Sequence, residues 1–408
     1  MKRVFDYIEK NKKRIVDLTK KLVSIPTVNP PGENYEVIVA FLKKECKSMG
    51  LKTREIRVPK KELKKHGINR GSARINLLAE WNTRAEKTLH LNGHYDVVPA
   101  TSSWSSPPFK PVVRGGKIFG RGTEDMKGNI ASVLMSVEAL KVNNLKPRCN
   151  VELSFTPDEE TGGAAGFGYL VKKGIVKPDY AIGEGYQNDF FSYGNKGMVW
   201  FRIVVHGKSC HGSEPHKGIN SFEKMLMVAS ELVKLKNRVA KRTTSHATRR
   251  EIDRHATMVL GGELFGGSKI NIVPDRSVFT IDRRVLPEER LEDVKSEVID
   301  AIERLKKNDR DLKVDVEIFA REEPAVSRRD SIIFKEFSDS ISKVTGRRGR
   351  CALLAGATDM RFLIRKGIPC VGYSPDGGHS CHGDNEYVNI RSLIDTAKIL
   401  ARVIANVK

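Results

Sequence analysis

The first half of the chain alternates between two hydrophobic periods. Apolar residues recur with helical spacing over 4–23 and 34–49, and strand-like runs follow at Arg74–Glu80 and Thr88–Asp96. The alternation continues with a helix expected over 127–142, a strand over Val151–Thr156 and a helix over Gly166–Lys173. Strands that alternate with helices predict an α/β layer on a largely parallel sheet.

The middle of the chain has a different order of elements. Strands are expected at Met198–His206, Ala256–Gly262, Ser277–Val285 and Lys313–Phe319, and helices at Ser221–Leu235 and Glu289–Leu305. This β-α-β-β-α-β order is that of the ferredoxin-like α+β unit. The last part of the chain returns to helix–strand alternation. The patterns therefore predict a discontinuous α/β domain, 1–195 plus 323–408, with a lid inserted at 196–322.

Length and composition agree with two folded domains. The chain has 408 residues, more than one ordinary core needs, and 39% of them are hydrophobic without a run long enough to span a membrane. The start is charged throughout, which indicates an amphipathic helix and not a signal peptide. The six cysteines form no C-x-x-C pair. We therefore expect reduced thiols, a cytoplasmic protein and no membrane partner.

The formal net charge of +22 raises the question of nucleic-acid binding. The basic residues are dispersed, as in Arg347, Arg348 and Arg350, and neither aromatic–basic interleaving nor a nucleic-acid motif accompanies them. A lysine- and arginine-rich surface, as in some thermophiles, accounts for the charge, and a small anionic substrate fits it equally well. We expect no nucleic-acid partner.

Candidate chemistry gathers where the expected strands end, which is where an open α/β sheet places its site. His94 and Asp96 lie two apart on a strand and face one side, so the carboxylate can fix the tautomer of a metal-bound imidazole. Taken alone, such a pair is more often a structural histidine with its partner. Asp125, between glycines in GRGTEDMKG, can be aimed at a cation or can cap the helix that follows.

Further acids and histidines stand at similar positions. Three adjacent acids at 158–160 follow the strand VELSFTP and precede two glycines. Either a metal or exposure to water relieves their repulsion, and the strand end favours a site. Glu184 in DYAIGEGY follows another apolar strand. His379 and His382 lie three apart beside glycines, and His382, which is followed by acids, is the better ligand candidate.

The chemical types and the motifs lead to one family. Oxygen-rich ligation with two histidines and no thiolate pair suits zinc, cobalt or manganese, and a carboxylate shared by two ions is the usual two-metal design. The chain resembles the di-zinc aminohydrolases, which include acetylornithine deacetylase, succinyl-diaminopimelate desuccinylase, aminoacylase and glutamate carboxypeptidase. The resemblance spans nearly the whole chain, through SIPTVNPPG, HYDVVP, WSSPPFKP, GRGTEDMKG, DEETGG and HGDNEYV.

The resemblance implies a fold and a set of roles. The fold would be a zinc-peptidase-like α/β catalytic domain with an inserted ferredoxin-like α+β lid. Asp125 would bridge two ions, Asp96 would orient His94, and Glu159 would be the general base. The ligands implied for two divalent metal ions, zinc or else cobalt or manganese, are His94, Asp125, Glu160, Glu184 and His382.

The resemblance also implies functional residues outside the metal centre. The lid segment SCHGSEPHKGINS resembles the family's histidine motif, so His211 would contact the scissile carbonyl. We expect it to act from the neighbouring subunit of a homodimer formed through the lid. Asn271 in KINIVP and Arg284 in IDRR match positions that bind a substrate carboxylate. Gly356 and Thr358 lie in a segment that matches a pocket-lining loop.

Two positions depart from the family's pattern. Glu184 is followed by Gly185 where family members often carry proline, which leaves Asp179 and Asp189 as alternative ligands. Cys381, beside the last histidine, is also not expected. Its thiol would either support the metal ligands or be a small buried residue.

The reaction implied is metal-dependent hydrolysis of the amide bond of a small anionic N-acyl amino acid, as in amino-acid biosynthesis. Glu159 would take the proton of the attacking water. A dipeptidase or carboxypeptidase with the same machinery is the alternative. A non-catalytic metal-binding protein is a third interpretation, against which Glu159 argues because a structural metal site needs no free base. Acetyl, succinyl, formyl and aminoacyl groups are all compatible with the sequence.

Overall fold

The computed structural model describes all 408 residues and divides the chain into two compact units. The first unit, which we call the catalytic unit, comprises Met1–Gly194, Ser327–Ala352 and Thr358–Lys408. The second, which we call the lid unit, comprises Asn195–Val326 and Leu353–Ala357.

The segment 353–357 was predicted to belong to the catalytic domain, whereas the structure groups it with the lid unit. The reason is backbone pairing. Leu353 N donates to Ala247 O at 2.7 Å, and Lys196 N donates to Leu354 O at 3.0 Å.

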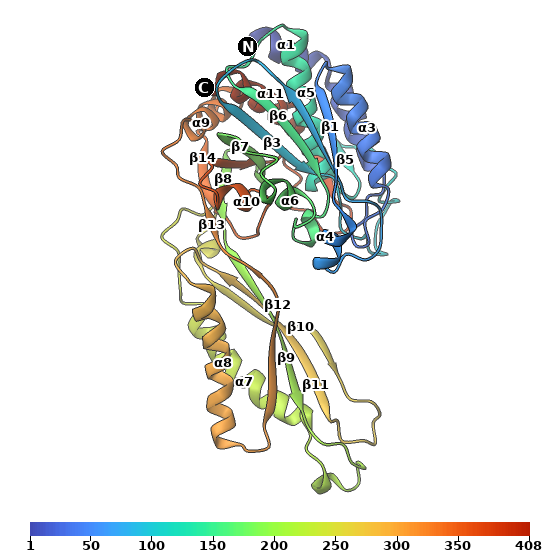
Figure 1. Cartoon of the computed structure of the whole chain (residues 1–408), viewed down its shortest axis with the longest axis vertical. Helices are drawn as coiled ribbons and strands as arrows, with labels where there is room; N and C mark the ends of the chain where they lie inside the picture. The colour runs from blue at the N-terminus through green and yellow to red at the C-terminus, as the bar shows by residue number, and fades with distance from the viewer. The chain divides into compact units, whose positions relative to one another are not determined.

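A nine-stranded sheet, of which all strands except β13 lie wholly or mostly in the catalytic unit, forms the centre of that unit (Figure 1). Its order is β1-β2-β6-β3-β7-β15-β8, and the short strands β13 and β14 complete it beside β8. The strands are β1 (Lys52–Arg57), β2 (Ile75–Trp81), β3 (Thr88–His94), β6 (Asn150–Thr156), β7 (Tyr180–Tyr186), β8 (Phe190–Asn195), β13 (Ala325–Val326), β14 (Arg350–Leu354) and β15 (Cys370–Tyr373).

Only the centre of this sheet is parallel. Strands β6, β3, β7 and β15 run in one direction, whereas β1 and β2 on one side and β8 on the other pair antiparallel. The sheet predicted to be largely parallel is therefore mixed at its edges. In the parallel part, His94 at the end of β3 is in register with Thr156 at the end of β6. Residues that follow these strands consequently meet at one edge of the sheet.

Helices pack against this sheet and against one another. The long helix α5 is buried along nearly its whole length because its sequence, GNIASVLMSVEALKV, is apolar or small on every side. It contacts α1, α2 and α11, while α3 lies against β1 and β2. The helices are α1 (Lys2–Lys10), α2 (Lys12–Val23), α3 (Tyr35–Ser48), α4 (Lys60–Lys65), α5 (Gly128–Val142), α6 (Phe167–Lys172), α9 (Ile332–Thr345), α10 (Arg361–Ile364) and α11 (Ile390–Asn406). None of the chain's helices is both long and apolar enough to cross a membrane.

The single helix predicted over 4–23 is wrong, because the chain forms two helices separated at Asn11. The backbone of Asn11 leaves helical geometry, with φ −100° and ψ 26°. Its side-chain Nδ2 donates to the Tyr7 carbonyl at 2.8 Å. Asparagine commonly competes with the helix for backbone partners in this way, and the hydrophobic period alone does not reveal it.

The lid unit contains the predicted β-α-β-β-α-β order. Its antiparallel sheet has the order β10-β11-β9-β12. Apolar residues of strands and helices, among them Phe201, Leu232 and Val298, form one buried cluster between the sheet and its two helices. The elements are β9 (Gly197–His206), α7 (Ser221–Val239), β10 (Thr257–Gly266), β11 (Arg276–Val285), α8 (Leu291–Asn308) and β12 (Lys313–Glu322).

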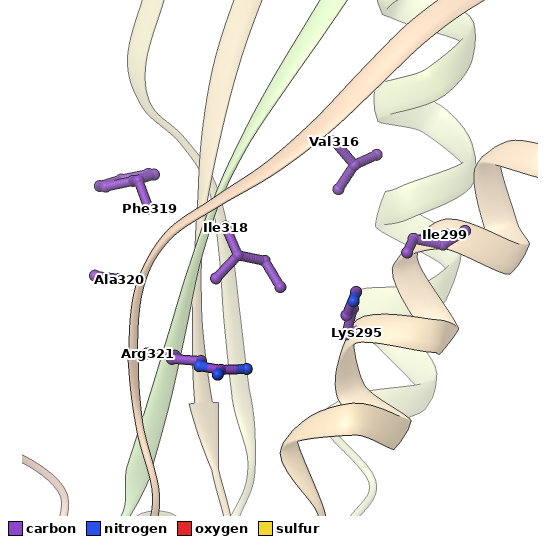
Figure 2. Close-up of a pocket in the computed structure, with 7 residues that line it drawn as sticks. All are labelled: Lys295, Ile299, Val316, Ile318, Phe319, Ala320 and Arg321. Atoms are coloured by element: carbon purple, nitrogen blue, oxygen red, sulfur yellow. The ribbon is translucent and has the colours of Figure 1, made fainter.

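A groove of about 490 Å³ lies in the lid unit between α8 and β12 (Figure 2). Its polar lining consists of Lys295 and Arg321, and the remainder is apolar or small. The groove contains no histidine or carboxylate, so it lacks the groups that the predicted hydrolysis needs.

Candidate metal centre

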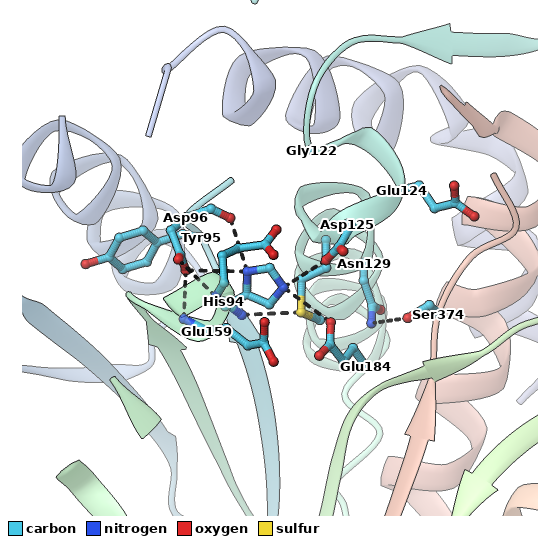
Figure 3. A network of polar contacts seen from close by, with 12 residues as sticks. His94, Tyr95, Asp96, Gly122, Glu124, Asp125, Asn129, Glu159, Glu184 and Ser374 are labelled. Carbon is cyan, nitrogen blue, oxygen red and sulfur yellow. Dashed lines mark hydrogen bonds and ion pairs between the residues drawn. The ribbon is translucent and has the colours of Figure 1, made fainter. Parts of the chain in front are cut away.

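Several of the predicted ligands meet around His94 at the end of β3 (Figure 3). Its Nε2 lies 2.9 Å from Asp125 Oδ1 and 3.2 Å from Glu184 Oε2. Its Nδ1 faces Asp96, at 3.1 Å from the backbone oxygen and 3.5 Å from Oδ1. Asp96 thereby fixes the buried ring with Nε2 directed towards the carboxylates. Carboxylates and carbonyls that contact the other ring nitrogen orient metal-bound histidines in the same way.

A second group of side chains forms around His382. Its Nε2 lies 3.2 Å from Asp125 Oδ2 and 3.0 Å from Glu160 Oε2. The two oxygens of Asp125 therefore face two different histidines, one oxygen to each. The structure thus brings together all five predicted ligands, in two adjacent groups that share one carboxylate.

The backbone around Asp125 decides between the two interpretations that the sequence left open. Helix α5 begins at Gly128, and the residue that precedes its first turn is Lys127. Asp125 lies before this point with extended backbone angles, φ −123° and ψ 97°. It therefore does not cap the helix, and its carboxylate points to His94 (Figure 3).

The three acids that follow β6 are not equivalent. Asp158 is buried and forms an ion pair with Arg74, with 2.8 Å between Oδ2 and Nε. Its left-handed backbone, φ 64°, turns the chain so that Glu159 and Glu160 reach the cluster. The backbone N–H groups of these two residues donate to the Asp96 carboxylate at 3.2 and 3.3 Å. Asp96 thus fixes both the histidine and the acidic turn.

Burial and neighbouring groups raise the pKa values of two histidines and two glutamates in this cluster, for different reasons. Burial lowers the pKa of His94, but its hydrogen bonds to carboxylates outweigh this and raise the pKa well above the usual range. Hydrogen bonds to Asp125 and Glu160 raise the pKa of His382 to about 10. Burial, together with the charge of Asp125, raises the pKa of Glu160 to about 7. Burial and then the charge of Glu184 raise the pKa of Glu159. A bound divalent cation relieves the electrostatic repulsion among crowded carboxylates of this kind.

The donor set fits metal ions. Ligands about 2.0–2.1 Å from a tetrahedral zinc ion lie roughly 3.3 Å apart, which is close to the separations between the histidine nitrogens and the carboxylate oxygens. Glu160 Oε1 is buried and accepts no hydrogen bond, so it is available as a further donor atom. Ligand atoms of His94, Glu159 and Glu184, and likewise of His94, Asp125 and Glu160, lie within 4.8 Å of one another. The cluster can therefore hold metal.

The alternatives to these ligands lie elsewhere. Asp179 Oδ2 accepts from Thr88 N at the start of β3, roughly 20 Å along the strand from His94. Asp189 forms an ion pair with Arg350 at 2.5 Å. Neither acid replaces Glu184. Cys381 is exposed, so its interpretation as a small buried residue is wrong.

All of the remaining predicted residues except Thr358 belong to the lid unit. His211 is exposed, and its loop pairs with the loop of Asn271 through Gly212 N and Asn271 O at 2.9 Å. Arg284 lies near the Val285 end of β11, opposite the end that follows the Asn271 loop, and its Nη2 is 3.0 Å from Asp282 Oδ2. Gly356 belongs to the lid unit and the buried Thr358 to the catalytic unit.

Sequence reasoning missed several residues around the cluster. Asn29 Nδ2 donates to Asp96 at 2.9 Å and to Asp158 at 3.1 Å, which ties the acidic turn to the motif SIPTVNPPG. Buried Arg361 donates to the Gly162 carbonyl at 2.7 Å and lies 3.8 Å from Glu159 Oε1. The only sequence signal for Asn29 was the motif itself.

Fold and site together define a class of protein. An open α/β sheet carries two adjacent histidine–carboxylate groups at one edge and an inserted α+β unit, which is the construction of a metal-dependent hydrolase. Residues 90–406 match peptidase family M20/M25/M40, and the chain belongs to this family.

Known relatives extend over most of the chain. An uncharacterized metallohydrolase of Methanocaldococcus jannaschii is 28% identical, over 95% of this chain and 98% of that protein. Succinyl-diaminopimelate desuccinylase of Buchnera aphidicola is 31% identical, over 54% of this chain and 57% of that protein. Among solved structures, the M20 family metallo-carboxypeptidase of Sulfolobus solfataricus superimposes with a TM-score of 0.78 at 20% identity, covering 96% of this chain and 98% of that one.

These comparisons confirm the family resemblance and the predicted fold class, an α/β catalytic domain with an inserted α+β lid. They also confirm that the chain is a hydrolase that acts on amide bonds. Family membership and the cluster agree that the enzyme is a metallohydrolase.

Proposed function

We propose that this metallohydrolase is a deacylase that cleaves the amide bond of a small anionic N-acyl amino acid. The observation that carries the proposal is the position of Asp125, whose two carboxylate oxygens face His94 and His382. Glu159 lies close to His94 in the same cluster. The likeness to a desuccinylase supports an acyl substrate, and the net charge of +22 supports an anionic one. The six free cysteines agree with a cytoplasmic location.

Two divalent ions would share Asp125. His94 and Glu184 would complete one position, and His382 and Glu160 the other. This mixed nitrogen and oxygen set suits zinc, with cobalt or manganese as alternatives. When bound, such ions lower the pKa of a water molecule to about 7 and polarise the amide carbonyl.

Glu159 is the proposed general base. One of its carboxylate oxygens lies within 4.8 Å of a ring nitrogen of His94 and of a carboxylate oxygen of Glu184, but the five proposed ligands complete both ion positions without it. Burial and Glu184 raise its pKa, which favours proton uptake in the ion-free protein. In the reaction Glu159 would take a proton from the attacking water and return it to the leaving amine. Asp96 and Arg361 hold its backbone and side chain in place.

The lid unit supports the proposal of a homodimer. Strand β10 is an edge strand and exposes Val259, Leu264 and Phe265, with 64% of the Leu264 surface accessible. Helix α7 exposes Phe222 and Leu226, and Phe222, Leu264 and Phe265 line one hollow on the lid surface. Monomeric proteins rarely leave such an edge uncovered, and a second copy of the chain would cover it.

The two ends of the lid would serve different subunits. His211 and Asn271 lie beyond the Arg276 end of β11, whereas Arg284 is roughly 27 Å away at the other end. One small substrate cannot contact both groups of a single lid. We propose that Arg284, Gly356 and Thr358 bind the substrate from its own chain, and that His211 and Asn271 come from the partner subunit.

A substrate panel tests this function. N-acetyl, N-succinyl and N-formyl amino acids are compared with simple dipeptides in the presence of zinc, cobalt or manganese, and the released amine is measured. Turnover of N-acyl amino acids well above that of dipeptides supports the deacylase. The reverse order identifies a peptidase that uses the same centre.

A further inference from the structure

Glu386 holds the loop that carries Asp125. Its buried carboxylate accepts from the backbone N–H groups of Gly122 at 3.0 Å, Glu124 at 2.8 Å and Asp125 at 3.2 Å. It also pairs with the buried Arg121, at 2.7 Å from Nη1. The position of Asp125 thus depends on a side chain from the distant loop that contains His382.

Glu124 makes the reverse connection. Its carboxylate accepts from Ser380 N at 2.6 Å, from Ser380 Oγ at 3.0 Å and from His379 N at 3.1 Å. Figure 3 shows Glu124 pointing away from His94, whereas the adjacent Asp125 points towards it. The loop of Asp125 therefore holds the loop of His382 through a residue that does not contact the cluster.

The two loops are closely fitted at this connection. A Cβ atom at Gly377 would lie 2.5 Å from Glu124 Cδ, so only glycine allows the carboxylate to approach. Arg121 adds a third link, because its Nη2 donates to the His382 carbonyl at 3.3 Å. The contacts join segments that are about 260 residues apart in the sequence, with |i−j| of 255 to 264.

The two proposed ion positions depend on these loops to different degrees. His94 and Glu184 lie on strands β3 and β7, which the sheet hydrogen bonds hold in register. His382 is in a loop, with a left-handed φ of 63° and a side chain that is 54% exposed. The position of His382 therefore relies on whatever holds its loop against that of Asp125.

From these contacts we infer that Glu124 and Glu386 form a reciprocal carboxylate clamp that sets the affinity of the ion position made by Asp125, Glu160 and His382. The two glutamates are positioning residues, since their carboxylates contact the backbone and side chains of the two loops and none of the proposed ligand atoms. The inference rests on the proposed two-ion centre. It deepens that proposal by naming the residues that position the ligands of the loop-borne site, which we expect to be the second to fill.

The test is stepwise zinc binding to the metal-free protein. Bound zinc is measured at each step by equilibrium dialysis with elemental analysis. Glu124→Ala removes the connection from the Asp125 loop while leaving the buried Arg121–Glu386 pair intact. Loss of residues that orient metal ligands costs about 10–100-fold in metal affinity. We expect the second zinc ion to bind 10–100-fold more weakly and the first to bind as in the unchanged protein. Glu124→Gln, which retains one acceptor oxygen, should lie in between.

Asp179→Ala is the matched control. It also removes a carboxylate that accepts a backbone N–H, but at the start of β3, away from the cluster. Both binding steps should be unchanged in this variant. If Glu124→Ala does not fold, as judged by circular dichroism, Glu124→Gln carries the test.

Two results would overturn the clamp. The first is a Glu124 variant whose second step is unaltered or whose two steps weaken equally, and the second is an unchanged protein that binds only one ion. The proposed function is judged separately by amine release. A protein that binds two ions and hydrolyses no N-acyl amino acid contradicts the proposed function. The zinc-binding results for the clamp stand in that case.

Discussion

Asp96 connects the parts of the centre at the scale of single residues. Its carboxylate accepts from the N–H groups of Glu159 and Glu160 and from the amide of Asn29, while its backbone oxygen faces His94. One buried side chain therefore sets the orientation of a ligand histidine and of the turn that carries the proposed base. This division leaves Glu159 beside the proposed ion positions but not required as a ligand.

Glu159→Gln should separate binding from catalysis. The amide keeps the volume of the side chain but cannot take a proton, so turnover should fall by about 10²–10⁴, as expected for loss of a general base. Metal content, measured by elemental analysis, should remain near that of the unchanged protein. If metal is lost in parallel with activity, Glu159 is a ligand and the assignment is wrong.

Asp125→Ala should affect both ion positions together. Because each carboxylate oxygen faces a different histidine, its removal takes one ligand atom from each position. Bound metal should therefore decrease at both positions, in contrast to Glu124→Ala, which should weaken only one. A variant that still binds two ions tightly would exclude the bridging role.

The sequence located these residues because strand ends and glycine-flanked acids are local features. His94, Glu160 and Glu184 follow or end recognisable apolar segments, Asp125 lies between glycines, and His382 lies beside glycines and is followed by acids. The supporting contacts could not be predicted in this way. Glu124 and Glu386 interact with loops about 260 residues away, with |i−j| of 255 and 262, and nothing in either local sequence indicates the partner.

Among the elements, β10 and α7 leave an apolar surface uncovered on the lid unit. Leu264→Asp should convert a dimer into monomers, because burying a leucine contributes about 1.5–3 kcal/mol and a two-fold interface contains it twice. The measurement is molar mass by light scattering after size exclusion. Val142→Asp, at a residue with 56% exposure in the catalytic unit, is the control and should remain dimeric. A monomeric unchanged protein, or a dimeric Leu264→Asp variant, would contradict the proposed interface.

Element boundaries followed the hydrophobic pattern where packing and local preference agree. Helix α5 and the lid elements lie close to their predicted ranges because the same apolar residues form the observed cores. The single helix predicted over 4–23 is wrong at Asn11. The apolar period continues through this residue, but its side chain bonds to the Tyr7 carbonyl and its backbone leaves helical geometry. The antiparallel edges of the sheet were also not predictable, because strand direction depends on connections and not on the period of a single strand.

At the scale of the whole molecule, the proposed roles of the two ends of the lid imply a partner subunit. His211→Ala should lose about 10²–10³-fold in turnover with metals retained, as when one oxyanion donor is removed. Mixing His211→Ala with Glu159→Gln subunits should restore activity, since each heterodimer contains one complete site. With random pairing about half the dimers are mixed, so roughly a quarter of the original activity should return. If exchange of subunits is verified and no activity returns, His211 does not act across the dimer.

The most direct test of the central claim is reconstitution of the metal-free enzyme while amine release from the best N-acyl amino acid is followed. The two-ion centre predicts no turnover after chelation, recovery as zinc is added up to two equivalents per chain, and no recovery in Glu159→Gln at the same metal content. Full turnover by a protein that elemental analysis shows to be free of metal would contradict it.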